Sequence, residues 1–165
     1  MYRHFNYPAK FAKQKEGGYL VRFVDLPEAI TEGDDLDHAM QQAIDCLEEA
    51  IANRIELCSD IPIATEPKRG YDVVPLSPSM SAKAALYLAV REQKISKTKL
   101  AQLLHCDEKE VRRMLNPYYN SKIQQMEKAL QFLGQRLGTS VMPMSKLSKP
   151  AIRRSSKNGV VTQVL

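Results

Sequence analysis

The sequence has few of the residues from which metal sites, disulfide frameworks and nucleophilic catalytic centres are built. Its 165 residues include three cysteines and three histidines. The odd number of cysteines (Cys46, Cys58 and Cys106) and the lack of any C-x-x-C pair predict neither disulfides nor a zinc site. His4 and His38 have no neighbouring ligand set, and no Ser-His-Asp or Cys-His arrangement follows from spacing. We therefore expect no metal, no cofactor and no catalytic residues.

Long apolar runs are also absent. No stretch approaches the roughly 18 consecutive apolar residues of a membrane helix, and the first residues lack the charged and then apolar regions of a secretory signal. We expect a cytoplasmic protein that does not interact with membranes. The hydrophobic fraction of 44% is ordinary for a globular chain, and the length suits one domain or two small ones.

The charged residues divide the chain near Pro78. Residues 1–78 hold 8 Lys and Arg against 14 Asp and Glu, a net charge of −6. Residues 79–165 hold 16 against 5, a net charge of +11. This asymmetry predicts two modules, the basic one suited to a phosphate backbone and the acidic one to a basic surface. We place the modules at 1–76 and 77–138, followed by a basic tail, 139–165, for which we expect weak order.

The acidic module has the pattern of an α+β domain. Aromatic and β-branched residues form two runs separated by Gly17-Gly18, which is typical of a hairpin. From Leu36 to Ile55 apolar residues recur at helical spacing over about six turns. Aspartates at the start of this segment favour the positive end of the helix dipole. The predicted order is β-β-β-α-β, with strands at Phe5–Phe11, Tyr19–Val24, Ala29–Thr31 and Tyr71–Pro75.

Clustered carboxylates in this module suggest a two-metal nuclease as an alternative. Asp25, Asp34, Asp35 and Asp37 lie close in sequence, and such clusters can hold two Mg²⁺ about 4 Å apart. Three of the four, however, lie together at the start of the predicted helix, where capping and the helix dipole account for them. We therefore predict that the chain is not an enzyme.

The run GGYLVRFVDLPEAITEGDDLDHAMQQAIDCLEEAI joins a tyrosine-bearing strand, a D-L-P turn, a threonine, a G-D pair and an alanine-rich helix. It resembles the HicB antitoxin family, although Glu28 replaces that family's usual glycine. The resemblance covers most of residues 1–137 and implies a degraded ribonuclease-H-like sheet that binds and blocks HicA, a ribonuclease toxin. HicA folds like a double-stranded-RNA-binding domain and cleaves RNA with a histidine. A module of net charge −6 suits this partner, because an RNA-cleaving protein holds phosphates with basic residues.

The basic module is predicted to be all-α, with four helices. Serine and aspartate side chains supply candidate N-caps, because they can accept from the free backbone N–H groups of a first turn. The first helix is expected at Ala82–Arg91, Asn116-Pro117 ends the third, and apolar spacing extends the fourth from Ile123 to Leu137. The predicted caps are Ser79 or Ser81, then Ser96, then Asp107 with Glu110 in a capping box, and finally Ser121 with Gln124 in a second capping box.

The stretch KTKLAQLLHCDEKEVRRMLNP, residues 97–117, has the spacing of a helix-turn-helix. Ala101 and Val111, ten residues apart, match its small and β-branched core residues, and Leu104 and Met114 also fall on core positions. His105 stands where glycine is commonest because the backbone there tends to positive φ. Histidine tolerates that geometry at a cost of about 1 kcal/mol. With the closing helix, these residues resemble the Cro/repressor-type domain attached to one branch of HicB antitoxins.

The third helix presents candidate DNA-binding residues if it enters a major groove. Arg112 and Arg113 are the first candidates for base reading, since arginine can bond a guanine edge with two donors. Lys109 is a candidate for base or phosphate contact, and Glu108 could accept from a cytosine amine. The alternative for the two arginines is a solvated basic face. Residues predicted to grip backbone phosphates are Lys97, Thr98, Asn120 and Lys122.

Together these features predict an antitoxin of a type II toxin–antitoxin system. Residues 1–76 would block a HicA-like ribonuclease toxin, and residues 77–138 would bind operator DNA and repress the chain's own operon. A single helix-turn-helix covers about one half-site, so a homodimer or higher oligomer is expected. The alternative is a stand-alone helix-turn-helix transcription regulator whose N-terminal domain serves dimerisation or ligand sensing.

Overall fold

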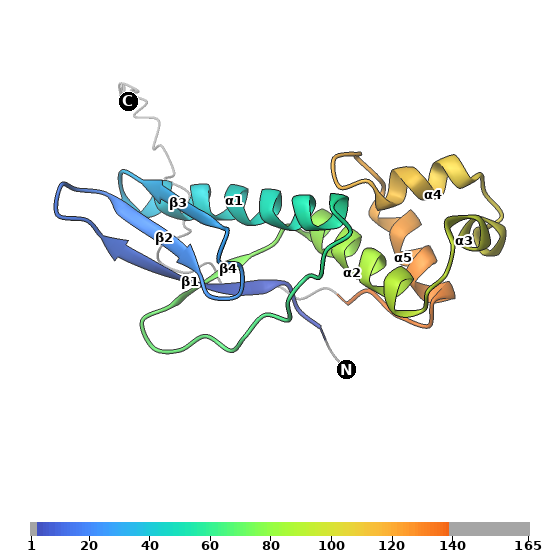
Figure 1. Cartoon of the computed structure of the whole chain (residues 1–165), viewed down its shortest axis with the longest axis horizontal. Helices are drawn as coiled ribbons and strands as arrows, with labels where there is room; N and C mark the ends of the chain where they lie inside the picture. The colour runs from blue at the N-terminus through green and yellow to red at the C-terminus, as the bar shows by residue number, and fades with distance from the viewer. Residues whose placement is uncertain (1–2, 139–165) are drawn as a thin grey trace, which may run out of the picture.

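The computed structural model describes residues 3–138, and the predicted weakly ordered tail, 139–165, lies outside them (Figure 1). The described residues have an α+β fold in which a four-stranded antiparallel sheet and one helix precede a helical region. No helix among them is long and apolar enough to cross a membrane. The elements are β1 (Asn6–Lys13), β2 (Tyr19–Phe23), β3 (Ile30–Gly33), α1 (Leu36–Glu56), β4 (Asp72–Pro75), α2 (Pro78–Glu92), α3 (Lys97–Leu104), α4 (Glu108–Leu115) and α5 (Ile123–Phe132).

The sheet has the strand order β3-β2-β1-β4, so the predicted hairpin of β1 and β2 lies at its centre. Helix α1 packs along one face of the sheet, as its apolar spacing predicts (Figure 1). The predicted β-β-β-α-β order is therefore confirmed. Alternate strand residues enter this core, where they meet the buried residues of α1. The largest side chains that this core buries completely are Tyr7, Leu26, Met40, Leu47 and Ile51.

The junction between β3 and α1 requires a glycine and a capping carboxylate. A Cβ on Gly33 would lie 2.3 Å from the backbone nitrogen of Ala39, so only glycine allows this close approach. The Asp35 side chain accepts from the backbone N–H of His38 at 2.8 Å and caps α1, as predicted. Asp25, by contrast, accepts from the backbone N–H of Thr65 at 3.0 Å and holds the loop that follows α1. Two of the four clustered aspartates of the sequence, Asp25 and Asp35, therefore have separate structural roles.

Helix α2 joins the two parts of the fold, because it contributes to two apolar cores. Met80, Ala84 and Tyr87 belong to the core beneath the sheet, whereas Leu86 and Ala89 belong to the core of the helical region. Further contacts fix α2 to the loop after α1. The Tyr87 hydroxyl donates to the carbonyl oxygen of Ser59 at 2.7 Å, and Arg91 pairs with Asp60 at 3.0 Å.

Several predicted helix caps are wrong. Ser77, not Ser79 or Ser81, caps α2, because Pro78 occupies the first helical position, for which its fixed φ is suited. Asp107 is the N-cap residue of α4, as predicted, but its side chain makes no capping hydrogen bond, and Glu110 accepts from Gln125 of α5 at 2.9 Å instead of completing a capping box. Helix α5 begins after Lys122 rather than Ser121, since the Ser121 hydroxyl donates to the carbonyl oxygen of Arg113 at 3.1 Å. Ser96 caps α3 as predicted.

Four helices end at a residue with left-handed backbone geometry. His105 has φ 52° and ψ 46°, the conformation for which its position usually carries glycine. Its backbone N–H donates to Gln102, and that of Cys106 donates to Ala101, which satisfies carbonyls at the end of α3. Gly134 ends α5 in the same way, so the predicted continuation of this helix to Leu137 is wrong. The left-handed residues are Cys58, Lys94, His105 and Gly134.

Candidate nucleic-acid interface

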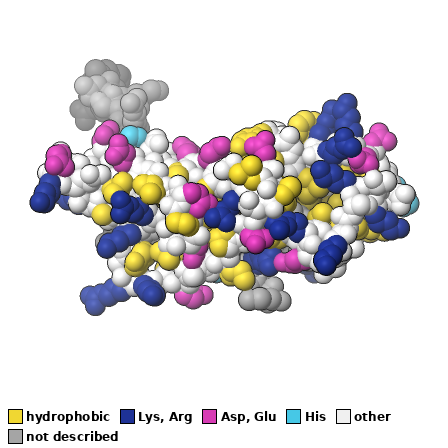
Figure 2. All heavy atoms as spheres, in the orientation of Figure 1, with side chains coloured by type: hydrophobic (Ala, Val, Ile, Leu, Met, Phe, Trp, Pro, Cys, Tyr) yellow, Lys and Arg dark blue, Asp and Glu magenta, His cyan; other side chains and the backbone are white. Residues whose placement is uncertain are grey.

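Helices α3 and α4 are two eight-residue helices joined by a turn at 105–107. Their contact is apolar, and every core position predicted from the ten-residue interval is buried: Ala101, Leu104, Val111 and Met114. Packing of this side leaves the other side of α4 to solvent. Lys and Arg side chains accordingly gather over α4 in the space-filling view (Figure 2).

The carboxylate of Glu108 connects the start of α3 to the outer side of α4. The Thr98 hydroxyl donates to one oxygen of Glu108 at 2.7 Å, and the Arg112 guanidinium donates to the other. Both hydrogen bonds lower the pKa of Glu108, and the bond from Thr98 has the larger effect. The positive charge of nearby Lys97 lowers this pKa further. These bonds therefore direct the Arg112 side chain along α4. They also occupy the Glu108 carboxylate, which the sequence predicts as an acceptor from a cytosine amine.

A groove of about 440 Å³ lies between α4 and the start of α5. Four of the eight sequence-predicted residues line it: Lys109 and Arg113 from α4, and Asn120 and Lys122 from the following loop. The Arg113 guanidinium lies 5.3 Å from the centre of the Tyr119 ring, a cation–π arrangement that restrains both side chains. The eight predicted residues thus separate into this groove and the cluster around Glu108.

The loop at 116–122 is held from below by a residue that the sequence pattern did not reveal. Lys83 of α2 is 3% exposed, and its Nζ donates to the carbonyl oxygen of Asn116 at 2.7 Å and to the Ser121 hydroxyl at 3.3 Å. Burial lowers the pKa of this amine. The sequence does contain one sign of this burial, because Lys83 lies among the small apolar residues of its helix. In the structure that helix packs on two sides.

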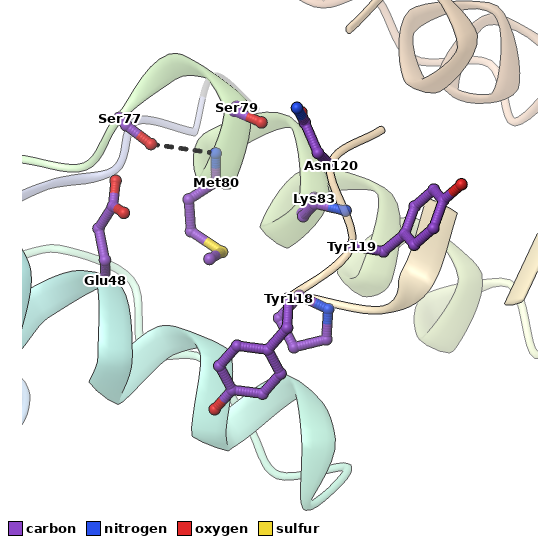
Figure 3. A pocket seen from close by; sticks show the side chains of 9 residues that line it. Glu48, Ser77, Ser79, Met80, Lys83, Tyr118, Tyr119 and Asn120 are labelled. Atoms are coloured by element: carbon purple, nitrogen blue, oxygen red, sulfur yellow. Dashed lines mark hydrogen bonds between the residues drawn. The ribbon is translucent and has the colours of Figure 1, made fainter. Parts of the chain in front are cut away.

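The two tyrosines of this loop point in different directions (Figure 3). Tyr119 lines the groove beside α4, whereas Tyr118 points towards α1 and donates to Glu49 at 3.0 Å. This hydrogen bond raises the pKa of Tyr118. Between them and α2 is a smaller hollow of about 170 Å³, which Glu48 and Lys83 help to line. The loop is therefore fixed to both parts of the fold.

Helix α1 carries the opposite charge. Its exposed side bears carboxylates along its whole length, and acidic side chains mark this helix in the space-filling view (Figure 2). The one arginine of α1, Arg54, pairs at 2.6 Å with Glu28, which lowers the pKa of that carboxyl group. Glu28 thereby neutralises the single Lys or Arg of this helix. The acidic face of α1 is defined here as Asp37, Asp45, Glu48, Glu49 and Glu56.

Comparisons with known proteins cover most of the described chain. Residues 6–85 match a protein family described as HicB_like antitoxin of bacterial toxin-antitoxin system. The chain is 34% identical over 134 residues to Antitoxin HicB of Escherichia coli K12, covering 79% of this chain and 95% of that relative. It is 30% identical over 139 residues to Antitoxin HicB 1 of Photorhabdus laumondii, covering 84% and 88%. Alignments of this length must include helical residues beyond position 85.

Proposed function

Because this chain belongs to the HicB family of bacterial antitoxins, whose members are not enzymes, we propose that it blocks a HicA-like ribonuclease toxin and represses its own operon. The two activities would reside in different modules. Residues 1–76 would bind the toxin and residues 77–138 would bind operator DNA. The opposite charges of α1 and α4 support this division, since the two partners carry opposite charges at their binding surfaces.

The acidic face of α1 is the proposed toxin-binding surface. A ribonuclease must hold RNA phosphates with basic residues, so a helix with carboxylates and no unpaired arginine can occupy the same place. Neutralisation would be steric and electrostatic, without chemistry. The order β-β-β-α-β is also what a degraded ribonuclease-H-like domain requires, in which the sheet remains as a scaffold. We assign residues 1–76 to that fold.

Charge reversal on α1 tests toxin binding. Asp37→Lys with Asp45→Lys should weaken capture of the co-expressed toxin and restore its RNA cleavage, because both lysines would face a basic surface. The matched control is Glu16→Lys with Glu66→Lys, which changes net charge equally at exposed positions away from α1. Loss of toxin capture in the control would show that net charge, not this face, controls binding. Operator binding without any toxin capture by the wild type would favour a stand-alone regulator.

Helices α3 and α4 are proposed to form a helix-turn-helix, with α4 as the recognition helix. The observation that carries this proposal is the exposed side of α4, where Lys109, Arg112 and Arg113 stand together. Arginine at such positions can read guanine edges. Asn120 and Lys122, on the other wall of the groove, would hold a backbone phosphate. One copy would cover one half-site, so we propose a homodimer or higher oligomer on an inverted repeat.

Removal of the two arginines tests DNA binding. Arg112→Ala with Arg113→Ala should abolish the specific shift of a duplex from the region upstream of the operon, while toxin inhibition persists. Lys68→Ala with Arg69→Ala is the matched control, because it removes the same charge from an exposed loop of the first module. A specific shift that survives the double arginine substitution would place the reading surface elsewhere.

A further inference from the structure

Two polar residues are buried among residues 3–138, and they bond to each other. Lys83 is 3% exposed and Ser121 is 6% exposed, with 3.3 Å between Nζ and the hydroxyl oxygen. Within the part of the chain that the structure describes, no carboxylate accepts from the Lys83 ammonium. Its other acceptors are the carbonyl oxygens of Asn116 at 2.7 Å and Met114 at 3.4 Å. All three acceptors belong to the end of α4 or to the loop that follows it.

The end of α4 explains why an ammonium is held there. The last carbonyls of a helix lack partners and carry the negative end of its dipole. Asn116 is extended, with ψ 119°, and Pro117 has no N–H, so beyond the Tyr119 N–H, which donates to the Asn116 carbonyl at 3.3 Å, the chain itself supplies few donors at this point. Lys83 supplies them from α2, and Ser121 extends the network by donating to the carbonyl oxygen of Arg113 at 3.1 Å. The network joins the end of α4 to the start of α5.

Burial of this ammonium is unfavourable for stability alone. Desolvation lowers its pKa, and no opposite charge compensates within its hydrogen-bonding distance. A methionine of similar length could fill the same space among the alanines of α2 without that cost. What methionine could not provide is three donors directed at one loop. Lys83 therefore contributes to the geometry of residues 116–122 rather than to the packing of the core.

The loop that Lys83 anchors also forms one wall of the groove. One wall of the groove is α4, with Lys109 and Arg113, and the other is the loop, with Asn120 and Lys122. The anchored atoms lie near the two ends of this loop, at Asn116 where it begins and at Ser121 just before Lys122. The buried amine is thus bonded to both ends of the loop that faces α4 across the groove.

We propose that Lys83 is a positioning residue for operator binding: without touching DNA, it holds the loop so that Lys122 engages a backbone phosphate beside the base that Arg113 reads. This inference rests on the proposed DNA-binding function. It predicts that Lys83→Met weakens binding of the upstream duplex by about tenfold and reduces the slope of log affinity against log salt by about 1, because Lys122 is the cation that the displaced loop carries. Toxin inhibition should not change, because α1 keeps its acidic face.

A double-mutant cycle distinguishes positioning from general destabilisation. Lys122→Ala should weaken duplex binding in the wild type but change it little in Lys83→Met, because the loop would already be displaced. Additive effects of the two substitutions would overturn the proposal. So would Lys83→Met affinity within about twofold of the wild type at an unchanged salt slope. Failure of the wild type itself to bind the duplex specifically would refute both the proposed function and this inference.

Milder variants keep the test valid if Lys83→Met does not fold. Ser121→Ala removes one of the three acceptors, and it should produce an intermediate loss of duplex affinity with toxin inhibition retained. Tyr118→Phe is the control, since it removes only the exposed bond to Glu49 and leaves the Lys83 anchor intact. Full duplex binding by Ser121→Ala, or an equal loss in Tyr118→Phe, would contradict the proposal.

Discussion

The left-handed residue at the end of α3 allows a quantitative test of the turn geometry. A left-handed conformation costs an L-residue about 1–2 kcal/mol, and histidine should lie at the lower end because it is enriched in this region. Glycine avoids this cost but loses about 0.5–1 kcal/mol through the greater freedom of its unfolded chain. The His105 side chain is exposed, so its removal creates no cavity. His105→Gly should therefore stabilise the protein by about 0.5 kcal/mol.

Thermal and urea unfolding measure this difference. For a protein of this length, 1 kcal/mol shifts the melting temperature by about 2–4 °C, so an increase of about 1–2 °C is expected. His105→Ala is the matched control, because it removes the imidazole but retains the Cβ that makes the left-handed conformation unfavourable. Operator affinity should remain unchanged in both variants. A His105→Gly protein that is less stable than His105→Ala would refute the assigned backbone conformation.

Two further predictions concern the sheet module. Gly33→Ala would place a Cβ 2.3 Å from the Ala39 nitrogen, so urea unfolding should show a loss of about 2 kcal/mol or more, and a loss below 0.5 kcal/mol would contradict the close contact. Burial raises the pKa of Tyr7 to about 12, above its ordinary 10, so the folded state holds the phenolic proton more tightly. The resulting stability, about 2–3 kcal/mol, is complete below pH 10 and lost as pH rises to 12. Tyr7→Phe should flatten this decline, although it loses the bond to Pro62 at every pH; an equally steep decline would exclude Tyr7 as its source.

The order of elements could be predicted from the sequence because the spacing of apolar residues is a local property of each segment. The residues that produce this spacing are the ones that the core buries. Apolar spacing from Leu36 to Ile55 predicts α1, which the structure places at Leu36–Glu56. The interval from Ala101 to Val111 likewise predicts a contact that is buried. In both segments the apolar residues belong to one packing face, so the sequence of the segment is enough to predict which residues are buried.

Helix ends were harder to predict, because their geometry depends on backbone conformations that most side chains do not specify. Cys58 and Lys94 end α1 and α2 with φ of 52° and 51°, yet neither residue type signals a turn. Ser79 and Ser81 had suitable side chains, but the fixed φ of Pro78 makes Ser77 the cap. The sequence shows which side chains are able to cap a helix. The conformation of the adjacent backbone determines which of them makes the capping hydrogen bond.

The candidate interface shows why a count of basic residues overstates the charge available to DNA. Within the basic module Lys83 is buried against carbonyl oxygens, Arg91 pairs with Asp60, and Arg112 pairs with Glu108. Oxygen atoms of the protein itself already hold these cations before any phosphate arrives. The cations free to neutralise phosphates around α4 are therefore those that line the groove, together with Lys97 at the start of α3. Affinity for a phosphate backbone depends on how many cations reach it together, so under the proposed DNA-binding function the spacing of the groove walls should matter more than the net charge of the module.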